Sequence, residues 1–271
     1  MEQRTIFITG AASGIGRATA IFFHQKGWFI GGYDTDEAKL SELKLELASN
    51  IVTGVLDVTD KAAFDIAMDN FSELTGGRLD IIFNNAGIAI GGRLDGIPFD
   101  SVIATVNVNL IGVLNGIHAA IPLLKATDNS LCFSMSSSAA TFGTAGMATY
   151  AATKYAVKGL TEALSVEFAT FGSRAADVSP GIIDTALWQG KSYVKGQERK
   201  VTNMPKLNAN RTDAGRTLGP EVVAQCVWDA YHSDTLHWYV PPELVDRERA
   251  KSASPEKLRD ESIAAQKSSK A

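Results

Sequence analysis

Short apolar runs alternate with longer amphipathic stretches along nearly the whole chain. Several of the short runs are almost continuously apolar, which is typical of strands that are covered on both faces. The runs predicted to form strands are Thr5–Thr9, Trp28–Tyr33, Ile51–Leu56, Leu79–Phe83, Ser130–Met135, Ala175–Val178 and His237–Val240. The stretches predicted to form helices are, to within a few residues, Gly14–Lys26, Glu37–Ser49, Lys61–Thr75, Phe99–Lys125, Thr149–Phe171 and Pro220–His232.

The alternation of strands and helices predicts an α/β fold. It implies a parallel sheet with right-handed crossovers and helices on both faces, a three-layer αβα sandwich around about seven strands. No break in composition divides the chain, so residues 1–245 are predicted to form a single domain. Residues 184–218 are polar and irregular, and long loops of this kind usually bind or cover a ligand. Residues 246–271 are charged and predicted to form a solvated extension, partly disordered or helical.

Composition narrows the class of protein further. Of the 271 residues, 45% are hydrophobic and 21% are charged, which is ordinary for a soluble globular protein. The net charge of −4 argues against a nucleic-acid partner. No apolar run reaches the roughly eighteen residues of a membrane span, so no membrane partner is expected. The two cysteines lack metal-ligand spacing, so we expect buried, reduced thiols, no bound metal and a cytoplasmic location.

A glycine-rich segment, Thr9-Gly10-Ala11-Ala12-Ser13-Gly14-Ile15-Gly16, follows the first predicted strand and opens the first predicted helix. Glycines at such a turn let backbone N–H groups approach a pyrophosphate at a helix N-terminus. Because the spacing differs from the usual Gly-x-Gly-x-x-Gly, a turn without a ligand is the alternative. Asp34 ends the second strand, and a carboxylate there accepts hydrogen bonds from ribose hydroxyls and repels a 2′-phosphate. The pattern therefore favours NAD over NADP.

Polar residues also follow the next two strands. Asp57-Val58 closes the third strand, where the carboxylate could accept from an adenine amino group or cap a helix. Asn84-Asn85-Ala86-Gly87 closes the fourth, either as part of a ligand crevice or as a polar turn. Since ligands of open α/β sheets bind at the carboxyl ends of the strands, both segments are candidates for one site.

Tyr150 and Lys154 lie four residues apart on a predicted helix, so the phenol and the ammonium share a face. A free tyrosine has a pKa of about 10, and a neighbouring cation favours the phenolate. The pair therefore predicts a proton-transfer device. Ser137, thirteen residues upstream, could hold a substrate oxygen.

Taken in order, these motifs resemble those of the short-chain dehydrogenase/reductase family over roughly residues 4–245. The segments that carry the resemblance are Thr9-Gly10-x-x-x-Gly14-x-Gly16, Asp57-Val58, Asn84-Asn85-Ala86-Gly87, Asn107-Val108-Asn109-Leu110-x-Gly112, Ser137, Tyr150-x-x-x-Lys154 and Pro180-Gly181-Ile182-Ile183-Asp184-Thr185. The resemblance implies a Rossmann-like domain, a nicotinamide cofactor, a homo-oligomer (dimer or tetramer) and a catalytic tetrad. The tetrad carries over as Asn109, Ser137, Tyr150 and Lys154, with Asn109 holding a water that links the lysine to solvent.

The resemblance also implies a set of cofactor contacts. The candidate cofactor-binding residues are Gly10, Ser13, Gly14, Ile15, Gly16, Asp34, Asp57, Val58, Asn85, Ala86, Gly87, Tyr150, Lys154, Pro180, Gly181, Ile183 and Thr185. Of these, the backbone around Ile183 and the hydroxyl of Thr185 are implied to hold the nicotinamide carboxamide. The segment Ala175-Ala176-Asp177-Val178 departs from the commoner family pattern. The resemblance says nothing about the tail beyond about Asp246.

The substrate side is predicted to be apolar. Its candidate residues are Ile88, Phe142, Met147, Leu187 and Trp188, with Ile90 and Tyr193 beside them. Such a pocket suits a hydrophobic secondary alcohol or ketone. The expected function is therefore NAD-dependent interconversion of the two. The alternatives are an NADP-dependent carbonyl reductase and a non-catalytic nicotinamide-binding sensor, against which the filled tetrad positions argue.

Overall fold

The computed structural model describes residues 3–194, 196–200 and 216–268. A seven-stranded sheet forms the middle of three layers. Its strands are β1 (Thr5–Thr9), β2 (Phe29–Asp34), β3 (Ile51–Val55), β4 (Ile81–Asn84), β6 (Leu131–Met135), β7 (Arg174–Pro180) and β12 (His237–Val240). They lie in the order β12-β7-β6-β4-β1-β2-β3, and every neighbouring pair is parallel. The predicted α/β fold, with its Rossmann-like parallel sheet of seven strands, is confirmed.

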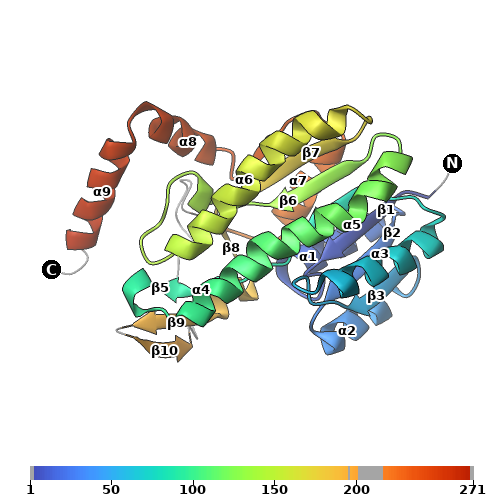
Figure 1. Ribbon diagram of the computed structural model, residues 1–271, viewed down its shortest axis with the longest axis horizontal. Coiled ribbons are helices and arrows are strands. Elements are labelled where there is room, and N and C mark those ends of the chain that lie inside the picture. The colour runs from blue at the N-terminus through green and yellow to red at the C-terminus, as the bar shows by residue number, and fades with distance from the viewer. Residues whose placement is uncertain (1–2, 195, 201–215, 269–271) are drawn as a thin grey trace.

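Helices cover both faces of this sheet (Figure 1). One face carries α1 (Gly14–Gln25), α2 (Glu37–Leu47) and α7 (Glu221–Tyr231). The other face carries α3 (Lys61–Thr75), α5 (Gly112–Ala126) and α6 (Ala148–Ala169). Because side chains alternate along a strand, Ile6 and Ile8 of β1 enter the core under α1, and Phe7 enters the core under α3.

Local chemistry explains where several helices begin and end. The Asp36 side chain accepts a hydrogen bond from Lys39 N at 3.1 Å and caps α2, and Asp60 accepts from Ala63 N at 3.0 Å and caps α3. Such caps satisfy backbone donors that the first turn leaves without partners. Gly76 ends α3 in the left-handed conformation that glycine adopts without a steric cost.

The predicted helix Phe99–Lys125 is interrupted near its middle. It consists of α4 (Phe99–Val106), a π-helical turn (Asn107–Ile111) and α5, which continues to Ala126. Within the described residues, this stretch is long and apolar enough to cross a membrane by length and composition alone. In the fold, its α5 part buries Val113, Ile117 and Leu124 against the sheet and α3.

Residues 184–218 are less irregular than predicted. They include a 3-10 turn (Ala186–Gln189), β9 (Lys191–Val194), β10 (Gln197–Lys200) and β11 (Thr217–Leu218), while residues 201–215 lie outside the described part of the chain. Strand β9 pairs with β10 and with β5 (Gly91–Gly92), and β11 pairs with β8 (Ile182–Ile183). β9 and β10 form a local antiparallel hairpin, whereas the β5–β9 and β8–β11 pairings join segments distant in the sequence and leave no recognisable local pattern.

The charged tail is helical, which is one of the two forms predicted for it. It consists of α8 (Leu244–Ala253) and α9 (Pro255–Ser268). Leu244 is buried at the start of α8, which lies beside the first half of α6, while α9 extends away from the sheet (Figure 1).

Candidate active site

A cavity of about 790 Å³ opens at the carboxyl ends of the central strands. At this end of the sheet, β1 lies between β2 and β4, so the chain leaves the sheet toward opposite sides next to β1. Open α/β sheets bind their ligands at such a point. Most of the predicted cofactor residues line it. These are Gly10, Ser13, Gly14, Ile15, Asp34, Asp57, Val58, Asn85, Ala86, Gly87, Tyr150, Lys154, Pro180, Gly181, Ile183 and Thr185.

The glycine loop forms one wall of the cavity, and its glycines are required sterically. Gly10 and Gly14 have φ values of +69° and +53°, which residues with a Cβ rarely adopt. Gly16 does not line the cavity, but a Cβ on it would lie 2.1 Å from Gly10 O and 2.7 Å from Asn85 Nδ2. The first turn of α1 can therefore approach the loop only with glycine at this position.

Asn85 and Thr9 hold the glycine loop against the end of β4. Asn85 Nδ2 donates to Thr9 O at 2.9 Å and to Gly10 O at 3.2 Å. In return, the Thr9 hydroxyl accepts from the backbone N–H groups of Asn85 and Ala86, at 3.0 and 3.1 Å. Asn85 thus belongs to the crevice rather than to a free polar turn.

Two carboxylates stand at the ends of β2 and β3. Asp34 Oδ2 accepts from Ala12 N at 3.0 Å and Oδ1 accepts from Asp36 N at 3.1 Å, so its carboxylate is fixed in the cavity wall. Asp57 Oδ1 accepts from the backbone N–H and the hydroxyl of Thr59. Because Asp60 caps α3, the helix-capping alternative for Asp57 is wrong.

Helix α6 and the loop after β6 bring Tyr150, Lys154 and Ser137 to the cavity wall. Both α6 side chains are buried, and Lys154 Nζ donates to Met135 O at 2.8 Å. The same nitrogen lies 5.6 Å from the centroid of the Tyr150 ring. Ser137 begins a 3-10 turn (Ser138–Ala140), where its hydroxyl accepts from Ala139 N at 3.1 Å.

Burial dominates the electrostatics of this pair in the free protein. Burial raises the pKa of Tyr150 above its usual value of 10, although a hydrogen bond with Ser137 acts in the opposite direction. Burial also lowers the pKa of Lys154 to about 8. In the protein without cofactor, burial therefore outweighs the effect of Lys154 on the pKa of Tyr150, and the joint effect of Lys154 and an oxidised nicotinamide stays a prediction. A buried site disfavours both charged forms, because each ion loses its hydration.

Asn109 lies behind the cavity wall, in the π-helical turn between α4 and α5. Its Oδ1 accepts from Ile88 N at 2.8 Å, and its Nδ2 donates to Ile88 O at 2.9 Å and to the Thr153 hydroxyl at 3.3 Å. A Cβ on Gly87 would lie 3.2 Å from Asn109 Oδ1 and 3.6 Å from Lys154 Nζ. Gly87 therefore leaves room for the Asn109 amide, and the Lys154 ammonium lies on the same side of this residue.

The substrate side differs from the prediction in several places. Ile88, Ile90 and Leu187 line the cavity. The lining includes neither Phe142 nor Met147, and Met147 packs instead against Tyr150 and its neighbours. Tyr193 is also absent from the lining, and the side chain of Trp188 lies outside the described part of the structure.

Sequence reasoning missed several residues that line the cavity. They are Thr35, Leu56, Ala89, Asp100, Ser101, Ala104, Val108, Met135, Ser136, Ala186, Gly190 and Lys191. The polar ones among them give the substrate side hydrogen-bonding groups that the predicted apolar pocket lacked. Ser101 comes from α4, and its hydroxyl lies 3.2 Å from the hydroxyl of Tyr193 on β9. No local pattern marks either residue, because α4 and β9 meet only in the fold.

Comparison with known proteins identifies the family. The family model described as short chain dehydrogenase matches residues 4–194. The chain belongs to the short-chain dehydrogenase/reductase family. Among its relatives in this family, the 3-oxoacyl-acyl-carrier-protein reductase FabG of Thermotoga maritima is 32% identical over 84% of this chain and 89% of the relative. Dehydrogenase/reductase SDR family member 6 of Rattus norvegicus is 34% identical over 84% and 90%.

Solved structures of short-chain dehydrogenases/reductases share the fold. One from Burkholderia phymatum in complex with NAD has a TM-score of 0.80 at 24% identity and covers 95% of both chains. The 3-ketoacyl-(acyl-carrier-protein) reductase of Brucella melitensis, complexed with NADH, has a TM-score of 0.77 at 25% identity and covers 88% of this chain and 97% of that one. As a member of this family, the protein is an NAD(P)-dependent oxidoreductase that acts on a small molecule.

The residues present fit a nicotinamide dinucleotide. The glycine loop leaves bare backbone where a single Cβ would collide with its surroundings, and it stands at the N-terminus of α1, which favours a pyrophosphate. Asp34 offers an acceptor fixed in the same wall. Among the residues that the structure describes, no group of three or more His, Cys, Asp and Glu side chains is arranged to hold a metal ion.

Proposed function

We propose that the protein interconverts a secondary alcohol and a ketone on a mainly hydrophobic small molecule, with NAD(H) as the cofactor. One observation carries this proposal. Tyr150, Ser137 and Lys154 line the same cavity as the glycine loop and Asp34, so a proton-transfer group and a dinucleotide cradle share one space. A non-catalytic sensor would have no use for a buried ammonium beside a buried phenol, each of which costs free energy to place there.

Each residue has a distinct role in the proposed reaction. The bound nicotinamide supplies the hydride acceptor or donor. In the oxidative direction, Tyr150 takes the proton from the substrate hydroxyl while Ser137 holds the substrate oxygen by a hydrogen bond. Lys154 supplies a positive charge that favours the phenolate of Tyr150. Asn109 holds the main chain at Gly87 and Ile88 against Lys154, which keeps the ammonium facing the cavity.

The burial of Tyr150 determines how much its pKa must be lowered for it to act as a general base. A general base works best when its pKa lies near the working pH, about three units below that of a free tyrosine. Three units correspond to roughly 4 kcal/mol in favour of the phenolate. Burial acts against this shift, so the charge of Lys154 and that of the oxidised cofactor must together exceed the cost of burial.

Asp34 supports NAD rather than NADP as the cofactor. Its carboxylate is held in the cavity wall by two backbone N–H groups, so it cannot easily turn away from a 2′-phosphate. Two nearby cations are already engaged, because Arg17 pairs with Glu46 and Lys39 pairs with Asp36. A 2′-phosphate would meet a fixed negative charge without a free guanidinium or ammonium from these two residues to balance it.

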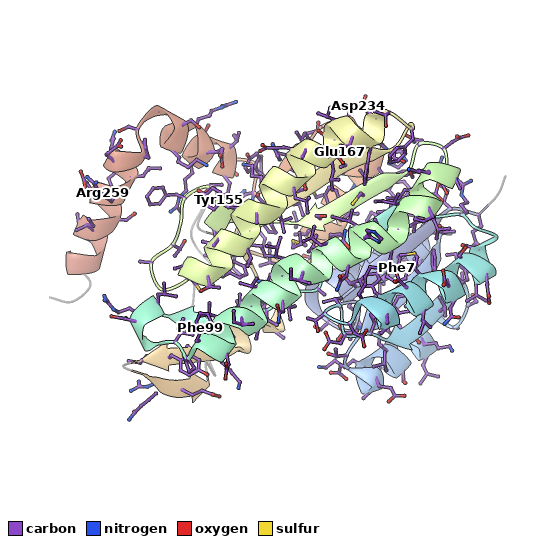
Figure 2. The ribbon with its side chains drawn as sticks, in the orientation of Figure 1. Phe7, Phe99, Tyr155, Glu167, Asp234 and Arg259 are labelled. Carbon is purple, nitrogen blue, oxygen red and sulfur yellow. The ribbon has the colours of Figure 1, made fainter. Side chains whose placement is uncertain are left out.

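A homo-oligomer is part of the same proposal. Phe99, Ile103 and Leu114 expose apolar side chains along the α4–α5 stretch, and 73% of the surface of Phe99 is exposed. Figure 2 shows Phe99 at the outer side of α4, away from the sheet. An exposed apolar row on one long helix favours burial against a second copy.

Substitution of Tyr150 by phenylalanine tests the proposal. Tyr150→Phe should lower kcat by a factor of about 100 to 10,000, because general acid–base catalysis is lost. Its affinity for NADH, measured by fluorescence titration, should stay within about twofold of wild type. Tyr155→Phe is the matched control: Tyr155 neighbours Lys154 on α6 but does not line the cavity. Near wild-type turnover by Tyr150→Phe would show that the assignment is wrong.

A further inference from the structure

The C-terminal helix α8 contacts the helix that carries Tyr150 and Lys154. Glu248 on α8 pairs with Lys158 on α6, with 3.1 Å between Oε2 and Nζ. Lys251, three residues along α8, donates to Glu248 Oε1 at 2.6 Å and lies 4.9 Å from the centroid of the Tyr155 ring. Figure 2 shows Tyr155 on the part of α6 nearest to α8. The family match ends at residue 194, so α8 lies outside it.

Lys158 is a second buried cation on the catalytic helix. It follows Lys154 by one turn, so both side chains leave the same face of α6, and both are almost completely buried. Lys158 Nζ donates to the Tyr239 hydroxyl at 3.1 Å and lies 5.4 Å from the centroid of that ring. Two like charges one turn apart destabilise one another, and burial strengthens this repulsion because it removes solvent screening.

Titratable groups from four elements surround Lys158. They are Glu162 on α6, Asp177 on β7, His237 and Tyr239 on β12, and Glu248 and Lys251 on α8. The fully buried Asp177 accepts a hydrogen bond from His237 Nδ1 at 2.6 Å, and Glu162 lies 3.3 Å from the other ring nitrogen. These two carboxylates therefore face His237, and Glu248 is the carboxylate in ion-pair contact with Lys158.

The ion pair is charged on both sides. Burial alone would lower the pKa of Lys158, but its hydrogen bond with Tyr239 and its ion pair with Glu248 hold that pKa above the usual value. Burial alone would raise the pKa of Glu248, but the hydrogen bond from Lys251 and the ion pair with Lys158 hold it below the usual value. A half-buried carboxylate thus balances a buried ammonium one turn from Lys154.

We propose that Glu248 is a positioning residue for catalysis, which acts through Lys158: it neutralises the second cation on α6 so that Lys154 keeps its proton at neutral pH. The inference rests on the proposed function, because it matters only if the Lys154 ammonium assists Tyr150. The pKa of Lys154 lies only slightly above neutral pH, since burial already lowers it to about 8. With Glu248 neutralised, Lys158 would lose the carboxylate in ion-pair contact with it, and the buried Asp177 would remain as a negative charge that acts on it.

The size of the effect follows from the charge alone. For unit charges on the order of 10 Å apart at an effective dielectric constant of about 20, the shift is roughly one pH unit. At pH 8, such a shift would reduce the protonated fraction of Lys154 from about one half to about one tenth, a fivefold loss of the active form.

The experiment measures kcat against pH for four variants of the full chain. In Glu248→Gln, the alkaline fall in kcat should move by about one unit to lower pH. In Lys158→Met, it should move to higher pH, because a repelling charge is gone. The double variant Lys158→Met/Glu248→Gln removes both charges of the pair and leaves Lys251, which is partly exposed over the Tyr155 ring, as the charged group of this contact, so its profile should stay close to that of wild type. Asp260→Asn is the matched control, since Asp260 pairs with Arg259 on the exposed helix α9.

The signs of these shifts separate an electrostatic role from a merely structural one. Loss of packing would lower thermal stability in both single variants and would move both profiles in the same direction or not at all. Either result overturns the inference. Failure of the proposed function has a different signature, which is a Tyr150→Phe variant that turns over substrate at the wild-type rate.

Discussion

Replacement of Lys154 by methionine should change how stability depends on pH. The pKa of this lysine falls from 10.5 in the unfolded chain to about 8 in the fold, because the fold buries it. Between these two values, the unfolded chain binds more protons than the native protein, so the stability of the wild type rises with pH. Methionine fills a similar volume and does not titrate, so Lys154→Met lacks this rise.

The expected size follows from the two pKa values. Between pH 7 and pH 9.5, the wild type should gain about 2 kcal/mol of unfolding free energy relative to Lys154→Met. The gain is small below pH 8, where the lysine is charged in both states, and it approaches a limit of about 3 kcal/mol above pH 10.5. For a chain of this size, 2 kcal/mol corresponds to a Tm difference of roughly 4 to 8 °C.

Urea unfolding followed by tryptophan fluorescence at pH 7 and pH 9.5 would measure this difference. The measure is the change in the wild-type-minus-variant difference, because the other titrating groups contribute to both proteins and cancel. Lys44→Met, which makes the same change at an exposed lysine of α2, is the matched control for the replacement itself. A wild-type-minus-Lys154→Met difference that stays constant, or falls as the pH rises, would refute the reasoning.

Two further predictions concern the cofactor. Asp34→Ala should lower the ratio of kcat/KM for NAD to that for NADP by tenfold or more, since a fixed negative charge is removed. Asp60→Ala, which removes the cap of α3 and does not line the cavity, should leave the ratio unchanged. An unchanged ratio in Asp34→Ala would count against the assignment of NAD. Gly16→Ala should cost about 1–3 kcal/mol in urea unfolding and weaken NADH binding at least tenfold, because its Cβ would lie 2.1 Å from Gly10 O. Gly159→Ala, where a Cβ on α6 meets nothing within 4 Å, should instead stabilise the protein slightly, and equal effects of the two changes would exclude the steric explanation.

The sequence determined the layered fold and most of the dinucleotide cradle. Each of the seven sheet strands contains a short apolar run, several of these runs are almost continuous, and each covering helix carries its own apolar face, so these elements follow from local patterning. The carboxyl ends of parallel strands meet at one edge. The strand order therefore brings three groups together: the glycines after β1, Asp34 after β2 and Asn85 after β4.

Only the tertiary structure determines which residues form the substrate wall, which helix the tail contacts and how strongly the active-site residues are buried. Ser101 reaches the cavity wall and bonds with Tyr193, and Lys158 meets Glu248, across sequence separations of 92 and 90 residues that no local pattern encodes. In the protein without cofactor, burial raises the pKa of Tyr150 above its usual value, an effect that the spacing of Tyr150 and Lys154 on the helix does not reveal. Chain spacing determines which groups are neighbours on a helix, whereas the loss of water around them depends on every element that packs over that helix.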